Sequence, residues 1–166
     1  MRVFTFVACA LVACSSDPPP LLGDYEGGAE FSADAFRPPQ VIEAGADSGA
    51  VEELDFEGVC TAGEAPVWHF FDFQTQTPGD SSLVMTAYTG DTEAALDSAK
   101  PAPLATVSGP DITSWTGVDV DPVLVQIGEH SRLFLRVTVE AKPASDGGGV
   151  PVLVHYRQQF DCVVGQ

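Results

Sequence analysis

The sequence predicts an all-β protein: an antiparallel two-sheet β-sandwich, jelly-roll-like, with at most one or two short helices and a disordered linker before it. Three observations support this prediction. Apolar and polar residues alternate with a period of two in several stretches, as in strands with one buried face. Clusters of Gly, Pro and Asp separate these stretches at short intervals. Segments with helical periodicity are almost absent, so two packed sheets are the expected architecture.

The sandwich domain is expected to occupy residues 51–166. Its first strand is expected at Leu54–Cys60, where Leu54 and Phe56 share one face and carboxylates the other. Three further strands are expected at Val67–Phe73, Ser82–Tyr88 and Leu104–Val107. Turns are expected between them at Thr75–Asp80, which has Pro-Gly at its centre, and at Thr89–Thr92.

One short helix is expected at Glu93–Ala99, with Asp91 or Thr92 as its N-cap and Pro101 ending it. Periodicity leaves two segments undecided. In Ile112–Val120 we expect Trp115 to lie in the core or to plug a loop, and the apolar run Val123–Ile127 fits either a strand or a single helical turn.

The two clearest strands lie near the C-terminus. In Arg132–Glu140 one face carries Leu133, Leu135, Val137 and Val139. In Val150–Cys162 one face carries Val152, Val154, Tyr156, Phe160 and Cys162, and the other carries Leu153, His155, Arg157, Gln159 and Asp161. The segment Pro143–Gly149 between them is rich in turn formers, so we expect these two strands to form a β-hairpin.

Composition narrows the classes of partner. The 166 residues carry a formal net charge of −17, from 24 acidic and 7 basic residues. A chain this acidic repels phosphate backbones, so nucleic acid is not an expected partner. No apolar run reaches the length of about 18 residues that a membrane-spanning helix needs.

The N-terminus has the features of a secretory signal peptide over residues 1–13. Arg2 supplies a positive charge, and Val3–Ala13 is apolar apart from Thr5. The segment ends in Leu11-Val12-Ala13-Cys14, which resembles the lipobox of Gram-negative bacterial lipoproteins.

In that family the cysteine thiol is acylated and the chain is cut just before it, so the resemblance implies a lipid anchor at Cys14. A cysteine with three acyl chains meets the need for more than one chain in stable membrane attachment. Ser15 resembles the outer-membrane sorting pattern. We therefore expect an exported protein anchored in the cell envelope, at the outer membrane. The alternative is an ordinary signal cut elsewhere, with Cys14 unmodified.

Residues 14–50 are expected to form an acidic, disordered tether rich in Pro and Gly. Residues 15–57 contain eleven acidic residues and one basic residue, Arg37, a net charge of −10. Low hydrophobicity with high like charge does not offset the entropy of ordering, and charged linkers extend. The simpler interpretation is a spacer; the alternative is a recognition segment around Phe31–Phe36 and Val41–Ile42.

Cys60 and Cys162 are the thiols that remain after the N-terminal segment is set aside. An even pair in an oxidising compartment favours a disulfide that joins the start of the domain to its end. A metal pair or a redox pair is the alternative, but CxxC spacing is absent and no His lies within four residues of either Cys.

Three segments resemble the closing hairpin of galactose-binding-like jelly-roll modules of secreted bacterial proteins. They are Arg132–Val139, Ser145–Gly147 and Pro151–Phe160, about a fifth of the chain. The resemblance implies a fold. It assigns no calcium or sugar residues, because these lie in loops that do not align.

Catalytic constellations are not recognisable, so we expect no enzymatic activity and no cofactor. Nucleophile elbow, phosphate loop and dinucleotide fingerprint are missing. His69, His130 and His155 lack zinc-binding spacing. Carboxylate pairs at glycosidase spacing are expected by chance on so acidic a surface. A bound calcium stays open, because oxygen ligands occur in three loop-like segments: Gly90–Thr92, Asp119–Asp121 and Asp146–Gly147.

Four aromatic side chains are candidates for stacking on a sugar ring: Trp68, Tyr88, Trp115 and Phe134. Trp68 lies within an apolar strand and is expected in the core, whereas Phe134 shares the face of Arg132 and Arg136. The first hypothesis is a non-catalytic envelope lipoprotein with a binding or structural module. The second is a carbohydrate-binding module that uses a loop cleft, with or without calcium. The third is an accessory subunit of an envelope protein complex.

Overall fold

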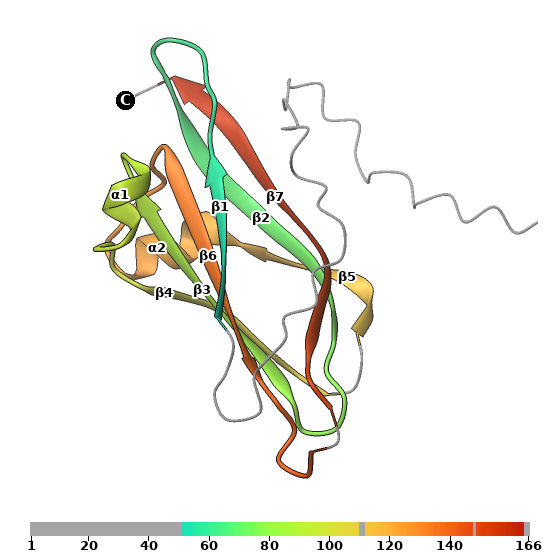
Figure 1. Cartoon of the computed structure of the whole chain (residues 1–166). Coiled ribbons are helices and arrows are strands. Elements are labelled where there is room, and N and C mark those ends of the chain that lie inside the picture. The colour runs from blue at the N-terminus through green and yellow to red at the C-terminus, as the bar shows by residue number, and fades with distance from the viewer. Residues whose placement is uncertain (1–50, 110–111, 148, 165–166) are drawn as a thin grey trace, which may run out of the picture.

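Two antiparallel β-sheets face each other across an apolar interior in the computed structural model (Figure 1), which confirms the predicted β-sandwich. The structure describes residues 51–109, 112–147 and 149–164. The predicted signal peptide (1–13), the anchor at Cys14 and the tether (14–50) lie outside the described residues.

The described chain forms seven strands. The larger sheet has the order β1-β6-β3-β4 and the smaller has the order β5-β2-β7. The strands of the larger sheet are β1 (Val51–Glu57), β6 (Phe134–Lys142), β3 (Ser82–Gly90) and β4 (Ala102–Ser108). Those of the smaller sheet are β5 (Ile112–Asp119), β2 (Glu64–Gln76) and β7 (Val152–Val164). Most connections therefore cross from one sheet to the other.

Two short helices complete the fold, as predicted: α1 (Glu93–Leu96) and α2 (Val120–Gln126). The Thr92 hydroxyl accepts a hydrogen bond from the Ala95 N–H and so caps α1, which settles the choice between Asp91 and Thr92. The undecided apolar run after residue 122 is helical and buries Leu124. Among the described residues no helix has the length and apolar character needed to cross a membrane.

The interior forms because alternating residues of facing strands point inward. Leu135, Val137 and Val139 of β6 are fully buried, as the alternation of this strand predicts. Across the interior, β2 contributes aromatic side chains, and the ring of Phe71 lies 6.1 Å from that of Tyr156 on β7. Each fully buried side chain of this size stabilises the fold by about 1.5–3 kcal/mol.

The predicted β6–β7 hairpin is wrong. β6 lies between β1 and β3, whereas β7 pairs with β2 along its whole length, from Glu64↔Val164 to Gln76↔Val152. The connection between β6 and β7 carries the chain from the larger sheet to the smaller one. Turn composition indicates where a chain bends, and it does not indicate which strand becomes the neighbour.

β7 also departs from strict alternation. Gln74 pairs with His155, but the next residue, Thr75, pairs with Leu153, so Val154 is an extra residue on β7. This β-bulge turns Leu153 into the core, where the sequence placed it on the polar face. The other end of β7 extends past the core, so Cys162 is exposed, although the alternation placed it on the apolar face.

The first strand ends earlier than predicted. β1 stops at Glu57, and Cys60 lies in the connection to β2. The paired ends of β2 and β7 near this connection form a two-stranded ribbon, which extends past the larger sheet at the top of Figure 1.

Candidate functional site

Cys60 and Cys162 form the predicted disulfide at the end of the β2–β7 ribbon. Their sulfur atoms are 2.01 Å apart and their Cα atoms 5.6 Å apart. The bridge ties the β1–β2 connection to the last strand, across a sequence separation of 102 residues. The two cysteines are therefore structural, and neither thiol is available as a nucleophile or as a metal ligand.

The three histidines lie on different elements of the fold. His69 projects from β2, with its Nε2 3.2 Å from Asp161 Oδ2 and its Nδ1 4.0 Å from Asp119 Oδ1. His130 is exposed in the segment after α2, and His155 lies on β7. Within residues 51–164 as described, no group of three or more His, Cys, Asp or Glu side chains is arranged to hold a metal ion.

Two of the loop aspartates considered for calcium already have side-chain partners. Asp91 is bound by Arg132, whose Nη1 lies 2.6 Å from the carboxylate. Asp121 accepts a hydrogen bond of 2.8 Å from Ser131, and Asp146 lies in the β6–β7 connection. In the described part of the chain, these aspartates do not belong to a group of three or more side chains that could hold a metal ion.

The candidate aromatic residues divide between the interior and the surface. Trp68 is 1% exposed, as predicted for a core residue, and its Nε1 donates to the Arg132 carbonyl at 2.8 Å. Trp115 is only half-buried and lies within strand β5, so both predicted places, in the core or as a loop plug, are wrong. It lies on the outer face of the smaller sheet, where its ring stacks at 6.2 Å from that of His155. Tyr88 and Phe134 are half-buried on the larger sheet.

A hydrogen-bonded cluster occupies the middle of that outer face. The Asp72 carboxylate accepts hydrogen bonds from Arg157 Nε at 2.8 Å and from Gln159 Nε2 at 2.6 Å. The Arg157 guanidinium carbon also lies 5.1 Å from the centre of the Trp115 ring, a cation–π contact. We call Asp72, Trp115, Arg157 and Gln159 the outer-face cluster.

Gly117 makes room for this cluster. It pairs with Asp72 across the β2–β5 ladder, and a Cβ atom at this position would lie 2.4 Å from Asp72 Oδ1. The carboxylate can therefore lie across β5, where it is only 9% exposed. A carboxylate this buried needs the two donors that Arg157 and Gln159 supply.

A second β-bulge adds an aromatic ring to the same face. Trp68 pairs with Phe160 and Phe71 with Gln158, so β2 has one more residue than β7 in this interval. The extra residue places Phe70 on the outer face, where it is 45% exposed. Its ring lies next to Gly117, and a Cβ atom at Gly117 would be 3.3 Å from it. The outer face thus presents Phe70 and Trp115 on either side of a polar centre.

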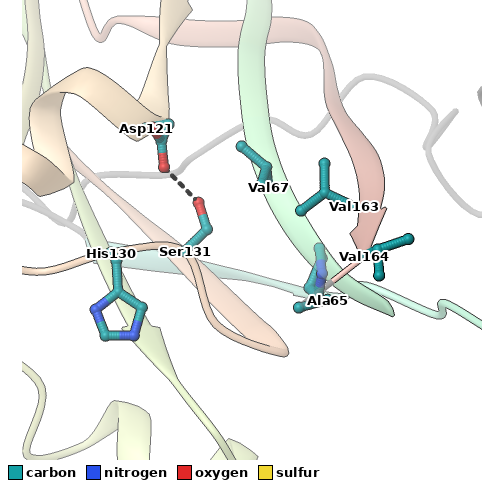
Figure 2. A pocket seen from close by; sticks show the side chains of 8 residues that line it. Ala65, Val67, Asp121, His130, Ser131, Val163 and Val164 are labelled. Carbon is teal, nitrogen blue, oxygen red and sulfur yellow. Dashed lines mark hydrogen bonds between the residues drawn. The ribbon is translucent and has the colours of Figure 1, made fainter. Parts of the chain in front are cut away.

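A shallow apolar groove lies beside the end of the ribbon that carries the disulfide (Figure 2), with a volume of about 430 Å³. Its lining includes Ala65, Val67 and Val163 on one side and Asp121, His130 and Ser131 on the other. Figure 2 shows the Ser131–Asp121 hydrogen bond among the residues that line the groove, with His130 next to Ser131. Ser131 also accepts the backbone N–H of Trp68 at 3.0 Å, which fixes this wall to β2.

The larger sheet carries an ionic cluster on its outer side. Arg136 donates to both oxygens of Asp55, at 2.7 and 2.9 Å, and to Asp97 at 2.9 Å, and Glu53 lies at 3.1 Å. The hydrogen bond with Asp55 is the main reason why the pKa of Arg136 is raised above its ordinary value. Bidentate pairing between neighbouring strands β6 and β1 indicates a structural role.

Sequence reasoning missed the outer-face cluster, although two signals for it exist. Asp72 is a lone carboxylate in the aromatic run 70–73, and Gly117 is a glycine within a strand, a position where another group often approaches closely. Neither signal indicates which residue binds Asp72, because Arg157 follows it by 85 residues in the sequence.

Comparison with known proteins adds no family to this picture: no family model matches the chain, and no curated protein matches it.

Proposed function

We propose that this chain is an exported, lipid-anchored envelope protein that presents a non-catalytic β-sandwich as a binding module. The observation that carries the proposal is the Cys60–Cys162 bridge, because structural disulfides persist in oxidising compartments outside the cytosol. The lipobox-like sequence ending at Cys14 supplies the attachment, and the acidic residues 14–50 supply the spacer.

Acylation at Cys14 is tested by producing the full chain in a Gram-negative host that is fed an alkyne analogue of palmitate. The unmodified chain should be labelled and should sediment with membranes, whereas Cys14→Ser should be unlabelled and soluble. Cys9→Ser is the matched control, because it changes the other cysteine of the same segment and should leave labelling intact. A Cys14→Ser chain that is labelled and stays in the membrane fraction would refute the anchor.

The outer membrane is the proposed destination. Separation of inner and outer membranes by density should place the labelled chain in the outer membrane, and Ser15→Asp should move it to the inner membrane. If both chains are found in the same membrane, Ser15 has no sorting role.

A resident metal or cofactor is not part of the proposal. The hydrogen bonds that already engage Asp91 with Arg132 and Asp121 with Ser131 support this view. The midpoint of thermal unfolding should therefore be the same in calcium and in EDTA, and a clear rise with calcium would show that a loop site exists.

The groove of Figure 2 favours a second candidate function, that of an accessory subunit. Its occupant would be an apolar segment of an envelope protein, flanked by Lys or Arg because Asp121 lines the groove and the chain carries a net charge of −17. A photo-crosslinking residue at Val163 should join the chain to such a segment, and the same residue at Thr106, on β4 of the larger sheet, should not. Equal crosslinking at both positions would dismiss this candidate.

A further inference from the structure

The outer face of the β5-β2-β7 sheet carries an ordered arrangement of side chains that the core does not require. A sheet face that is simply exposed to solvent needs no buried carboxylate, no glycine that makes room for a neighbouring side chain and no exposed aromatic ring. Here the three features occur together, at Asp72, Gly117 and Phe70.

We propose that this face binds a neutral oligosaccharide, with Phe70 and Trp115 stacking against sugar rings and Arg157 and Gln159 donating to hydroxyl groups between them. This names the ligand class of the binding module proposed above, and therefore rests on that proposal for its cellular setting. The location differs from the loop cleft that the sequence suggested, because the side chains come from the middle of three strands.

The spacing of the aromatic rings fits an extended chain of sugars. Phe70 of β2 pairs with Asp119 of β5, and Trp115 precedes Asp119 by four residues on the same strand. Four residues of an antiparallel strand span about 13 Å. At this backbone spacing the two side chains are expected to contact different sugar units of one short oligosaccharide lying along the sheet.

The polar groups between the rings are already held in position. Asp72 fixes Arg157 through Nε alone, so the two Nη groups remain to donate to a ligand, and among the described residues neither has a hydrogen-bond acceptor. Trp115 is held in turn by Arg157 and by His155. Groups that are locked before binding lose little conformational freedom, which favours a flexible ligand such as an oligosaccharide.

Charge selects a neutral ligand over an acidic one. Asp72 pairs with Arg157, and the remaining acids of this face, Asp119 and Asp161, flank His69. The chain as a whole carries a net charge of −17. Its field repels uronic-acid and sulfated polymers, and a neutral sugar pays no such electrostatic penalty.

The test uses the full chain carrying Cys14→Ser, so that binding is measured without the lipid and a failure of the anchor leaves the result unaffected. Retention is measured on insoluble neutral glycans (cellulose, xylan, mannan and chitin) and on acidic ones (polygalacturonate and heparin), followed by calorimetry with the matching soluble oligosaccharides. We expect binding to at least one neutral glycan and none to the acidic polymers, with no change in EDTA. Absence of binding to all neutral glycans, or preference for an acidic one, overturns the proposal.

Variants locate the site. Phe70→Ala changes an exposed side chain and should preserve folding while lowering affinity about tenfold, the loss of one stacking contact. Trp115→Ala should lower it at least as much, provided its circular dichroism melt shows a folded protein. Tyr88→Ala, an aromatic change on the outer side of the larger sheet, is the matched control and should bind as the parent does. Equal affinities for Phe70→Ala and Tyr88→Ala, or a loss of binding in EDTA, would place the ligand elsewhere.

Discussion

Removal of the Cys60–Cys162 bridge should destabilise the domain by about 3–5 kcal/mol, because the cross-link restricts the unfolded chain. For the observed separation of 102 residues, the chain-entropy relation gives a contribution of about 4.7 kcal/mol. With an unfolding entropy of about 2.1 cal/mol/K per residue over some 115 residues, this loss corresponds to a fall in Tm of about 20 °C. The bridge also holds the β1–β2 connection against the exposed end of β7, so hydrogen exchange should rise first at residues 160–164.

The assay is urea unfolding of the full chain in a Cys14→Ser background, with and without the pair Cys60→Ala and Cys162→Ala. The free energy of unfolding should fall by the amount above, and the m-value should rise because the unlinked chain exposes more surface when unfolded. Adding a reductant to the parent should reproduce the behaviour of the double variant, and adding it to the double variant should change nothing. A difference in free energy below about 1 kcal/mol, or an unchanged m-value, would refute the unfolded-state explanation.

Three further predictions follow from single side chains. Arg136→Met should lower the free energy of unfolding by about 1–3 kcal/mol, because it leaves three carboxylates facing one another. Arg132→Met, which removes an exposed ion pair, should lower it by less than about 1 kcal/mol in the same chemical unfolding assay. Ser145 donates two hydrogen bonds to the Asp80 carboxylate, one from its hydroxyl and one from its backbone N–H, and these lower the pKa of Asp80 below 3.8, the hydroxyl having the larger effect. Ionised Asp80 therefore stabilises the fold above pH 3.8. This stabilisation disappears as the pH falls through the lowered pKa. The Tm difference between the parent and Asp80→Asn should therefore be present at neutral pH and should vanish in strong acid; a constant difference would contradict the assignment. Phe71→Ala, at a fully buried position of β2, should cost about 3–5 kcal/mol by thermal or urea unfolding, and a cost near zero would mean that the interior is not packed as described.

The sequence was most informative where the physical cause is local. The alternation in β6 correctly placed Leu135, Val137 and Val139 inward, because side chains alternate along any strand whatever its neighbours are. Thr92 was a candidate cap for the same reason: its hydroxyl reaches a backbone N–H only three residues away. Cys60 and Cys162 could be paired without coordinates, because few thiols remained to choose from.

The candidate site was beyond the sequence because it depends on which strands become neighbours. Trp115 was expected in the core or as a loop plug, yet on β5, at the edge of a three-stranded sheet, it lies on the outer face against residues of β7. Asp72, Arg157 and Gln159 are close only because β2 pairs with β7, although turn composition favoured β6 as the partner of β7.

The sequence by itself determined most of the strands, the place of the first short helix and the cysteine pairing, because these follow from a side-chain period of two, from short-range hydrogen bonds and from the number of thiols. Only the tertiary structure decided the strand order, the bulges that turn Leu153 inward and Phe70 outward, and the cluster around Asp72. Each of these arises from contacts between segments far apart in the chain, and local periodicity contains no information about such partners.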